Sequence, residues 1–325
     1  NFTVVSLYGA GVALFIVLMF YLRIGDRGHY RYGEEYGSAR YATVKELASF
    51  RDKEPENDMI FTQNARMGLF NKRLPFNRQL NKNTLTVGLP GDGKTYTFVK
   101  PNLMQMNGSF VVTDPKGLLV RECGKMLEDN GYTIKIFDLV NFTNSNQFNV
   151  FHYMHDEMDI DRVATALKEG TKVSNNLGED FWNKAEMLLT RALIGFLYFD
   201  GKVLGKYEPN IAQMTDLLRN IQREHEDVPS PVERMFEELE EELPGNYACR
   251  QWQLFIDNAK GRTATSVRIM ATTVFAAFDH DVVRNLISRD SMEMEKWQTE
   301  KTAVFIAIPE TDKSFNFIAT VMFTM

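Results

Sequence analysis

Cysteine is scarce in this chain of 325 residues, which contains only two. Cys123 and Cys249 lie far apart and show no metal-ligand spacing, so neither a disulfide framework nor a cysteine metal site is expected. The sequence therefore favours a reducing compartment in which both thiols are buried.

An excess of positive charge is also missing. The formal net charge of -6 excludes a surface that is basic all over, so any nucleic-acid contact must be local. Acidic residues are absent between residues 59 and 91, where the cations are Arg66, Lys72, Arg73, Arg78 and Lys82. These side chains either form an ordinary solvated face or contact anionic lipid or a nucleic-acid strand.

Charge of either sign is absent from residues 3–22. At ~1.5 Å per residue this run spans the roughly 30 Å hydrocarbon core of a bilayer, which predicts one transmembrane helix within residues 1–24. Arg23, Arg27 and Arg31 follow the run, and their charge favours a cytoplasmic location for the rest of the chain.

The start of the chain gives two further expectations. Gly9 and Ala13 form a pair of small residues that either contacts another membrane helix or faces lipid. Because Asn1 stands directly before the apolar run, we expect that an upstream portion of the natural protein is missing.

The most specific motif is a phosphate-binding loop, which fits G-x-x-x-x-G-K-[ST] without a gap: Gly88, Leu89, Pro90, Gly91, Asp92, Gly93, Lys94 and Thr95. The β-branched run from Thr84 to Val87 before it predicts a strand, and a helix is expected after it. Glycines let backbone N–H groups surround the phosphates of ATP. Lys94 is expected on the β- and γ-phosphates and Thr95 on Mg²⁺. Asp92 is unusual there, because a carboxylate repels phosphate unless it points outward or meets a cation.

Strand patterns alternate with helical ones on both sides of a helical block. Residues 110–114, 134–138 and 302–308 are apolar runs that predict strands. This alternation predicts an α/β fold with a parallel sheet covered on both faces. Asp114 ends its strand where ligands bind in such sheets, which makes it a candidate catalytic or Mg²⁺-binding acid. Many ATPases with this loop carry that acid on a later strand instead.

The helical block divides the chain. Residues 25–155 are expected to form the first part of a nucleotide-binding domain, residues 156–255 an inserted all-α domain, and residues 256–325 an incomplete second part. Five glutamates on the helix from Phe236 to Leu243 form either a solvated face or an acidic docking surface. His152 and His155 have helical spacing, yet no third ligand is evident, so no metal site is expected there.

The last residues predict a helix from Phe315 to Met325 without a C-terminal cap. We expect its apolar face to be uncovered and the natural chain to continue beyond it. Residues 23–325 alone are therefore expected to aggregate, to bind Mg-ATP weakly and to hydrolyse it at background rate.

Together these features resemble one family, the TraG-like coupling proteins of type IV secretion and conjugation. The resemblance covers the chain from the membrane span onward and rests on the loop and five further motifs: GSARYAT at 37–43, VKPNL at 99–103, VTDPKG at 112–117, EDFW at 179–182 and IPETD at 308–312. The sequence departs from the family pattern at Tyr41, Asp92, Leu118 and Val150. These positions usually hold a Trp, a small residue, a Glu and part of an Asn-Pro pair.

The resemblance implies a RecA-like domain interrupted by an all-α domain that recognises substrate. It implies a membrane-bound hexamer that hydrolyses ATP and delivers a relaxase and single-stranded DNA to the proteins of a secretion channel. It places the Mg²⁺-binding acid and the catalytic acid beyond Met325, which leaves Asp114 as a supporting acid near the nucleotide.

Two other functions fit the same sequence. One is a substrate-docking receptor whose nucleotide site does not hydrolyse. The other is a pilus or filament ATPase that acts on protein alone.

Overall fold

The computed structural model describes residues 3–25, 40–70, 74–171, 180–225, 227–259, 261–310 and 314–325. Several residues used above lie outside the described part of the chain: Arg27, Arg31, residues 37–39, Lys72, Arg73, Glu179, Thr311 and Asp312. The side chains of Arg78 and of residues 180–182 are also outside it. The chain divides into two compact units, Asn1–Lys82 and Asn83–Met325, which are described separately.

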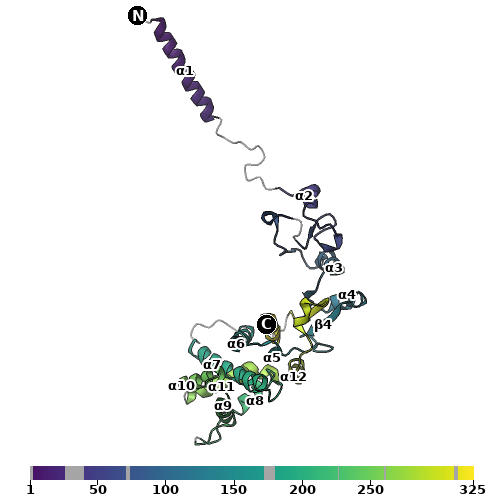
Figure 1. The fold of residues 1–325 in the computed structure, drawn as a ribbon, viewed down its shortest axis with the longest axis vertical. Helices are drawn as coiled ribbons and strands as arrows, with labels where there is room; N and C mark the ends of the chain where they lie inside the picture. The colour runs from purple at the N-terminus through teal and green to yellow at the C-terminus, as the bar shows by residue number, and fades with distance from the viewer. Residues whose placement is uncertain are drawn as a thin grey trace. The chain divides into compact units, whose positions relative to one another are not determined.

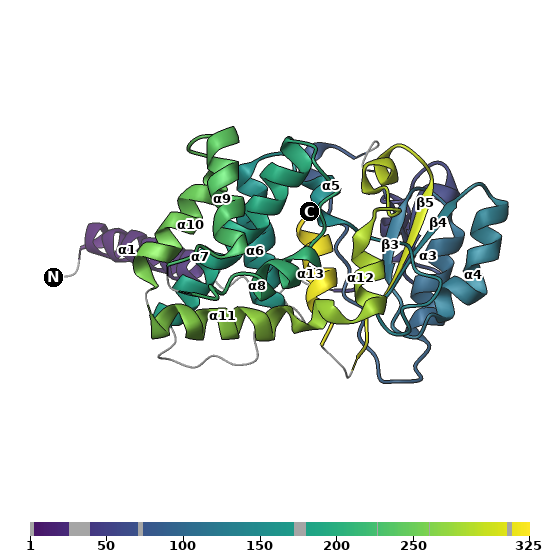
Figure 2. The same ribbon diagram turned by 90° about the horizontal axis from the view of Figure 1, so that it is seen from below.

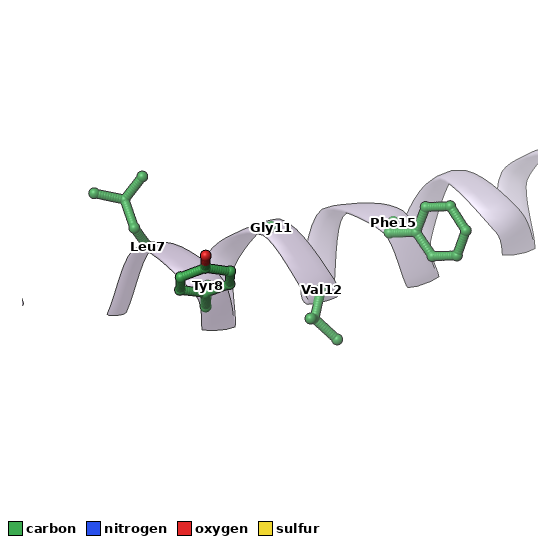
Figure 3. Close-up of a pocket in the computed structure, with 5 residues that line it drawn as sticks. All are labelled: Leu7, Tyr8, Gly11, Val12 and Phe15. Atoms are coloured by element: carbon green, nitrogen blue, oxygen red, sulfur yellow. The ribbon is translucent and has the colours of Figure 1, made fainter. Parts of the chain in front are cut away.

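The first unit begins with α1 (Val4–Gly25), drawn in purple in Figure 1. It is the one helix of the described residues that is long and apolar enough to cross a membrane. Its exposed side chains are apolar on every face, which suits a lipid-facing helix better than an amphipathic one. Gly11 leaves a hollow of about 340 Å³ beside Leu7, Tyr8, Val12 and Phe15 (Figure 3).

The rest of the first unit is small. It holds α2 (Val44–Ala48), an antiparallel pair of β1 (Asp58–Ile60) and β2 (Arg66–Gly68), and the 3₁₀ turns Pro55–Asn57 and Phe76–Arg78. Thr43 caps α2 in a capping box with Glu46, whose carboxylate also binds Arg40 at 2.8 Å. The buried Asp58 carboxylate accepts the Asp52 N–H at 2.8 Å, which fixes the turn before the strand pair.

A three-stranded parallel sheet is the core of the second unit. Its order is β3 (Phe110–Thr113), β5 (Thr302–Ala307) and β4 (Thr133–Asp138), so the last strand in sequence lies between the other two. The register pairs Val112 with Phe305 and Ile136 with Phe305. All three strands expected from the apolar runs are confirmed, and their carboxyl ends share one edge of the sheet.

The central strand β5 separates two apolar cores. Ala303 and Phe305 face a small core formed with α4 (Leu118–Asp129) and α3 (Lys100–Met104). Val304 and Ile306 face the larger core that the helices after β4 form. Successive strand residues point to opposite faces, so a strand buried on both faces is apolar throughout. This arrangement explains the unbroken run that begins at Thr302.

The helical block forms most of the large core. Its helices α6, α7, α8 and α11 lie together in Figure 2. Gly195 of α7 lies against Ala248 of α10, because a side chain built there would be 2.9 Å from the alanine Cβ. The block and its links contain α5 (Val150–Tyr153), α6 (Glu157–Thr171), α7 (Asp180–Phe196), a π-helical turn Leu197–Val203, α8 (Gln213–Arg219), α9 (Pro231–Glu242), α10 (Tyr247–Asn258), α11 (Arg262–Phe275), a 3₁₀ turn Ala276–Asp279, α12 (Asp281–Ser288) and a 3₁₀ turn Met294–Gln298. The expected all-helical stretch is confirmed, whereas its role as an inserted domain stays a prediction.

The prediction that the last helix has an uncovered apolar face is wrong. In α13 (Asn316–Thr324) the side chains of Phe317, Ile318, Val321 and Met322 are buried. The helix packs on α6, and the Phe317 ring meets Phe278 edge to face. The helical block supplies this cover, so the reason given for aggregation does not hold.

The strand expected before the phosphate loop is also absent. Residues 84–87 are not in the described sheet, and Leu85 and Val87 are 88% and 84% exposed. A β-branched run becomes a strand when a neighbour and a buried face offset the entropy of ordering it. Neither side chain contributes to a core here, so composition alone overstated the strand.

Candidate nucleotide-binding site

The phosphate loop has the backbone that its glycines predict. Gly91 and Gly93 have φ of 93° and 76°, a region that favours glycine. The chain then enters a helix with a π-helical first part, Thr95–Val99, that continues as α3. Pro101 lies in the first turn of α3, where proline is tolerated, and the helix ends at Met104. The predicted turn and helix are therefore confirmed.

Lys94 is folded back over the loop. Its Nζ donates hydrogen bonds to Gly88 O at 2.6 Å and to Leu89 O at 2.9 Å. Thr95 is exposed at the start of the helix, and Thr97 Oγ1 donates to Gly93 O at 2.9 Å. Lys94 and the start of the helix thus both belong to the loop from Gly88 to Thr95. Together they form an arrangement suited to an anionic ligand. The binding of ATP and Mg²⁺ by these residues stays a prediction.

Asp92 does not point away from the loop, and within the described part of the chain it forms no ion pair. Its Oδ2 accepts the Leu89 N–H at 2.6 Å, and its own N–H donates to Leu89 O at 3.2 Å. The charge of Asp92 alone does not indicate this hydrogen bond. The signal was available, because Asp commonly bonds nearby backbone N–H groups in turns.

Asp114 lies at the end of β3, as predicted, and is buried. Its carboxylate accepts the N–H groups of Leu118 at 3.2 Å, Leu119 at 2.8 Å and Val120 at 3.3 Å. The carboxylate therefore satisfies the first N–H groups of α4, where a negative charge is favoured. This geometry gives Asp114 a structural role, while its role as a catalytic or metal-binding acid stays a prediction.

A second acid at the same sheet edge was not singled out from the sequence. Asp138 ends β4, and its Oδ1 accepts the N–H groups of Val140 at 2.8 Å and Asn141 at 3.0 Å. Asp114 and Asp138 thus both organise the backbone after a parallel strand. In both cases the sequence shows an apolar run that is followed directly by Asp, and this pattern could have identified Asp138.

The helical block contains an acidic groove between α9 and α10. Its volume is about 660 Å³, and its lining comprises Arg223, Glu233, Phe236, Glu237, Glu240, Glu241, Cys249, Arg250, Trp252, Gln253 and Ile256. The Phe236 and Trp252 rings stack with centroids 4.5 Å apart. Burial raises the pKa of the Cys249 thiol to about 11, so this thiol is a poor nucleophile at neutral pH.

The described residues contain no group of three or more His, Cys, Asp or Glu side chains arranged to hold a metal ion. His152 instead lies 3.8 Å from Glu295 through its Nε2.

Residues 39–325 match the family described as Type IV secretory system Conjugative DNA transfer. The chain belongs to this family. Its members are TraG/TraD-like coupling proteins, so the resemblance inferred from the motifs is confirmed. A comparison with curated proteins finds no match. The match identifies this chain as a conjugative DNA-transfer protein of the type IV secretion system. The matched residues include both the phosphate loop and the helical block.

Proposed function

We propose that this conjugative DNA-transfer protein is a membrane-anchored ATPase with a RecA-like nucleotide domain, which delivers substrates into a type IV secretion channel. The observation that carries the proposal is the loop from Gly88 to Thr95, where Lys94 and a helix N-terminus meet. The parallel sheet supports it, because ligands of such sheets bind at the carboxyl ends of the strands.

ATP and Mg²⁺ fit the residues of this loop. Among the described residues, the Lys94 ammonium donates only to loop carbonyls, which are weaker partners than phosphate oxygens. The exposed Thr95 hydroxyl is available to coordinate Mg²⁺. When bound, Mg-ATP supplies the phosphoryl group whose transfer to water drives transport. The loop residues would bind and orient it.

The proposed partners follow from the family. We propose a homo-oligomer, a hexamer as in the family, that contacts the secretion channel and receives a relaxase with single-stranded DNA. The helix α1 would hold the protein in membrane lipid, since its length and composition suit a membrane span. The rest of the chain would lie on the cytoplasmic side, because Arg23, Arg27 and Arg31 follow the span.

DNA-stimulated hydrolysis tests the proposal most simply. Single-stranded DNA should stimulate ATP hydrolysis by the full-length protein in membranes, and Lys94→Ala should remove both basal and stimulated rates. Nucleotide binding without hydrolysis at any DNA concentration would favour a docking receptor. Hydrolysis that responds to protein substrates but not to DNA would favour a pilus-type ATPase.

The groove between α9 and α10 favours the docking receptor as a second candidate. Glu237, Glu240 and Glu241 border stacked aromatic rings, which suits a cationic segment with an apolar residue. The bidentate pair of Arg223 and Glu233 closes part of the groove at 2.7 and 2.8 Å.

Charge reversal tests this docking surface. Glu237→Lys with Glu241→Lys should slow association with a basic peptide several-fold at low salt, because both glutamates are exposed. Glu238→Lys with Asp257→Lys is the matched control, since these exposed acids do not line the groove. Equal rates for the two double variants would exclude the groove as the docking surface.

A further inference from the structure

The phosphate loop contains an anion of its own. The Leu89 N–H donates to Asp92 Oδ2 at 2.6 Å. The carboxylate lies within the loop, because a Cβ built on Gly88 would be 3.1 Å from Asp92 Oδ2 and 3.3 Å from its Cβ. A backbone N–H of the segment that should surround phosphate is therefore already bonded to a carboxylate.

The cation of the loop is engaged in the same way. Lys94 Nζ donates to Gly88 O and Leu89 O, and its Cγ would be 3.4 Å from the same built Cβ on Gly88. Asp92 and Lys94 thus both lie against Gly88. Two donors of the loop are thus paired within it, the Leu89 N–H with Asp92 and the Lys94 ammonium with two carbonyls.

We propose that the Asp92 carboxylate acts as an internal phosphate mimic that closes the free loop and that a nucleotide must displace. This proposal rests on the proposed function, because it concerns the affinity of the same loop. A carboxylate repels the phosphates of a nucleotide bound in the same loop, so the Asp92 charge opposes binding while it stays on the Leu89 N–H. The wild-type loop should therefore bind nucleotide more weakly than the same loop without the carboxylate.

The competing explanation is that Asp92 only holds the turn in its binding shape. The two explanations predict opposite results for Asp92→Ala, which removes both the charge and the hydrogen-bond acceptor. Asp92→Asn removes the charge and keeps an acceptor oxygen. Asp129→Asn is the matched control, because Asp129 is an exposed acid on α4 that pairs with Lys125 at 2.6 Å.

Hydrogen exchange of the peptide containing residues 84–95 tests closure without any nucleotide. The Leu89 N–H should exchange roughly tenfold faster in Asp92→Ala than in the wild type, because its acceptor is lost. Asp129→Asn should leave this exchange unchanged. Equal exchange in the wild type and in Asp92→Ala would overturn the proposed closure.

Titration with Mg-ADP tests the competition. Asp92→Asn and Asp92→Ala should lower the Kd roughly 1.5-fold to fivefold, the range of an exposed charge interaction. A higher Kd for Asp92→Ala with a wild-type Kd for Asp92→Asn would overturn the phosphate-mimic role. If neither the wild type nor any Asp92 variant binds Mg-ADP, the proposed function fails and the mimic role fails with it. Binding by the wild type that both variants lose would overturn the mimic role alone.

Discussion

Gly170 of α6 and Phe317 of α13 lie so close that a Cβ built on the glycine would be 2.5 Å from the Phe317 Cβ and 2.6 Å from its Cα. Only a residue without a side chain permits this approach of the two helices. The contact explains why the last helix of the described chain is covered by the helical block, although the two elements are far apart in sequence.

Replacing Gly170 with alanine should lower the free energy of unfolding by about 1–3 kcal/mol, because the backbone of Phe317 cannot move as freely as a side chain. Denaturant unfolding followed by circular dichroism measures this change. Gly124→Ala in α4 is the control, since its new Cβ would meet only the Val120 side chain, at 3.4 Å. That variant should gain up to ~1 kcal/mol from helix propensity, and equal losses in both variants would contradict the close contact.

Asp114 gives a prediction that separates support of α4 from metal binding. Asp114→Ala should lower the free energy of unfolding by about 1–2 kcal/mol, because three backbone N–H groups at the start of α4 lose their acceptor. Asp114→Asn should recover part of this loss and should keep the wild-type Kd for Mg-ATP. Thermal unfolding and nucleotide titration measure the two effects. A wild-type stability combined with loss of Mg²⁺-dependent binding in Asp114→Asn would assign Asp114 to the metal instead.

Glu293 predicts an acid-dependent loss of stability. Its carboxylate bonds Lys135 Nζ at 2.6 Å and Lys296 Nζ at 2.5 Å, and these bonds lower its pKa from an ordinary 4.5 to about 2. A lowered pKa in the folded state adds stability that is complete above about pH 4.5 and is lost as the pH falls toward 2. Glu293→Gln should therefore be less stable than the wild type at pH 7.

The comparison of Glu293→Gln with the wild type across this pH range is the measurement. The difference in unfolding midpoint should shrink between about pH 4.5 and pH 2. Glu300→Gln is the control, because it removes a nearby glutamate while the ion pair between Lys135 and Glu293 stays in place. A difference that is the same at pH 7 and at pH 2 would exclude the ion pairs as its cause.

The sequence predicted those elements whose residues are buried on several sides. The strand at Thr302–Ala307 was identified because both of its faces are covered, and its apolar run is therefore continuous. The helix α7 was identified because Ala185, Leu189 and Ala192 repeat with the helical period and are buried. In these cases local pattern and tertiary packing agree.

The sequence failed where a contact joins distant segments or where a side chain bonds the backbone. Residues 84–87 have strand composition, yet their exposure shows that no core drives the strand. The cover of α13 depends on Gly170, which no local pattern connects with Phe317. The hydrogen bond between Leu89 and Asp92 was not predicted, although Asp commonly forms such bonds in turns, because the loop motif itself does not fix side-chain rotamers.

The most direct test of the central claim is the Kd for Mg-ATP of the wild type and of Lys94→Ala, measured on folded protein. Within the residues that the structure describes, Lys94 donates only to loop carbonyls, so its removal should leave the unfolding midpoint unchanged. Loss of a charged hydrogen-bond donor to phosphate should raise the Kd roughly tenfold to hundredfold. Lys125→Ala, which removes an exposed lysine from α4, is the matched control and should bind as the wild type does. A nucleotide-binding coupling protein requires that the wild type and Lys125→Ala bind Mg-ATP with the same affinity and that Lys94→Ala binds it more weakly. Equal affinity in all three proteins would contradict the assignment of the loop from Gly88 to Thr95 as the nucleotide site.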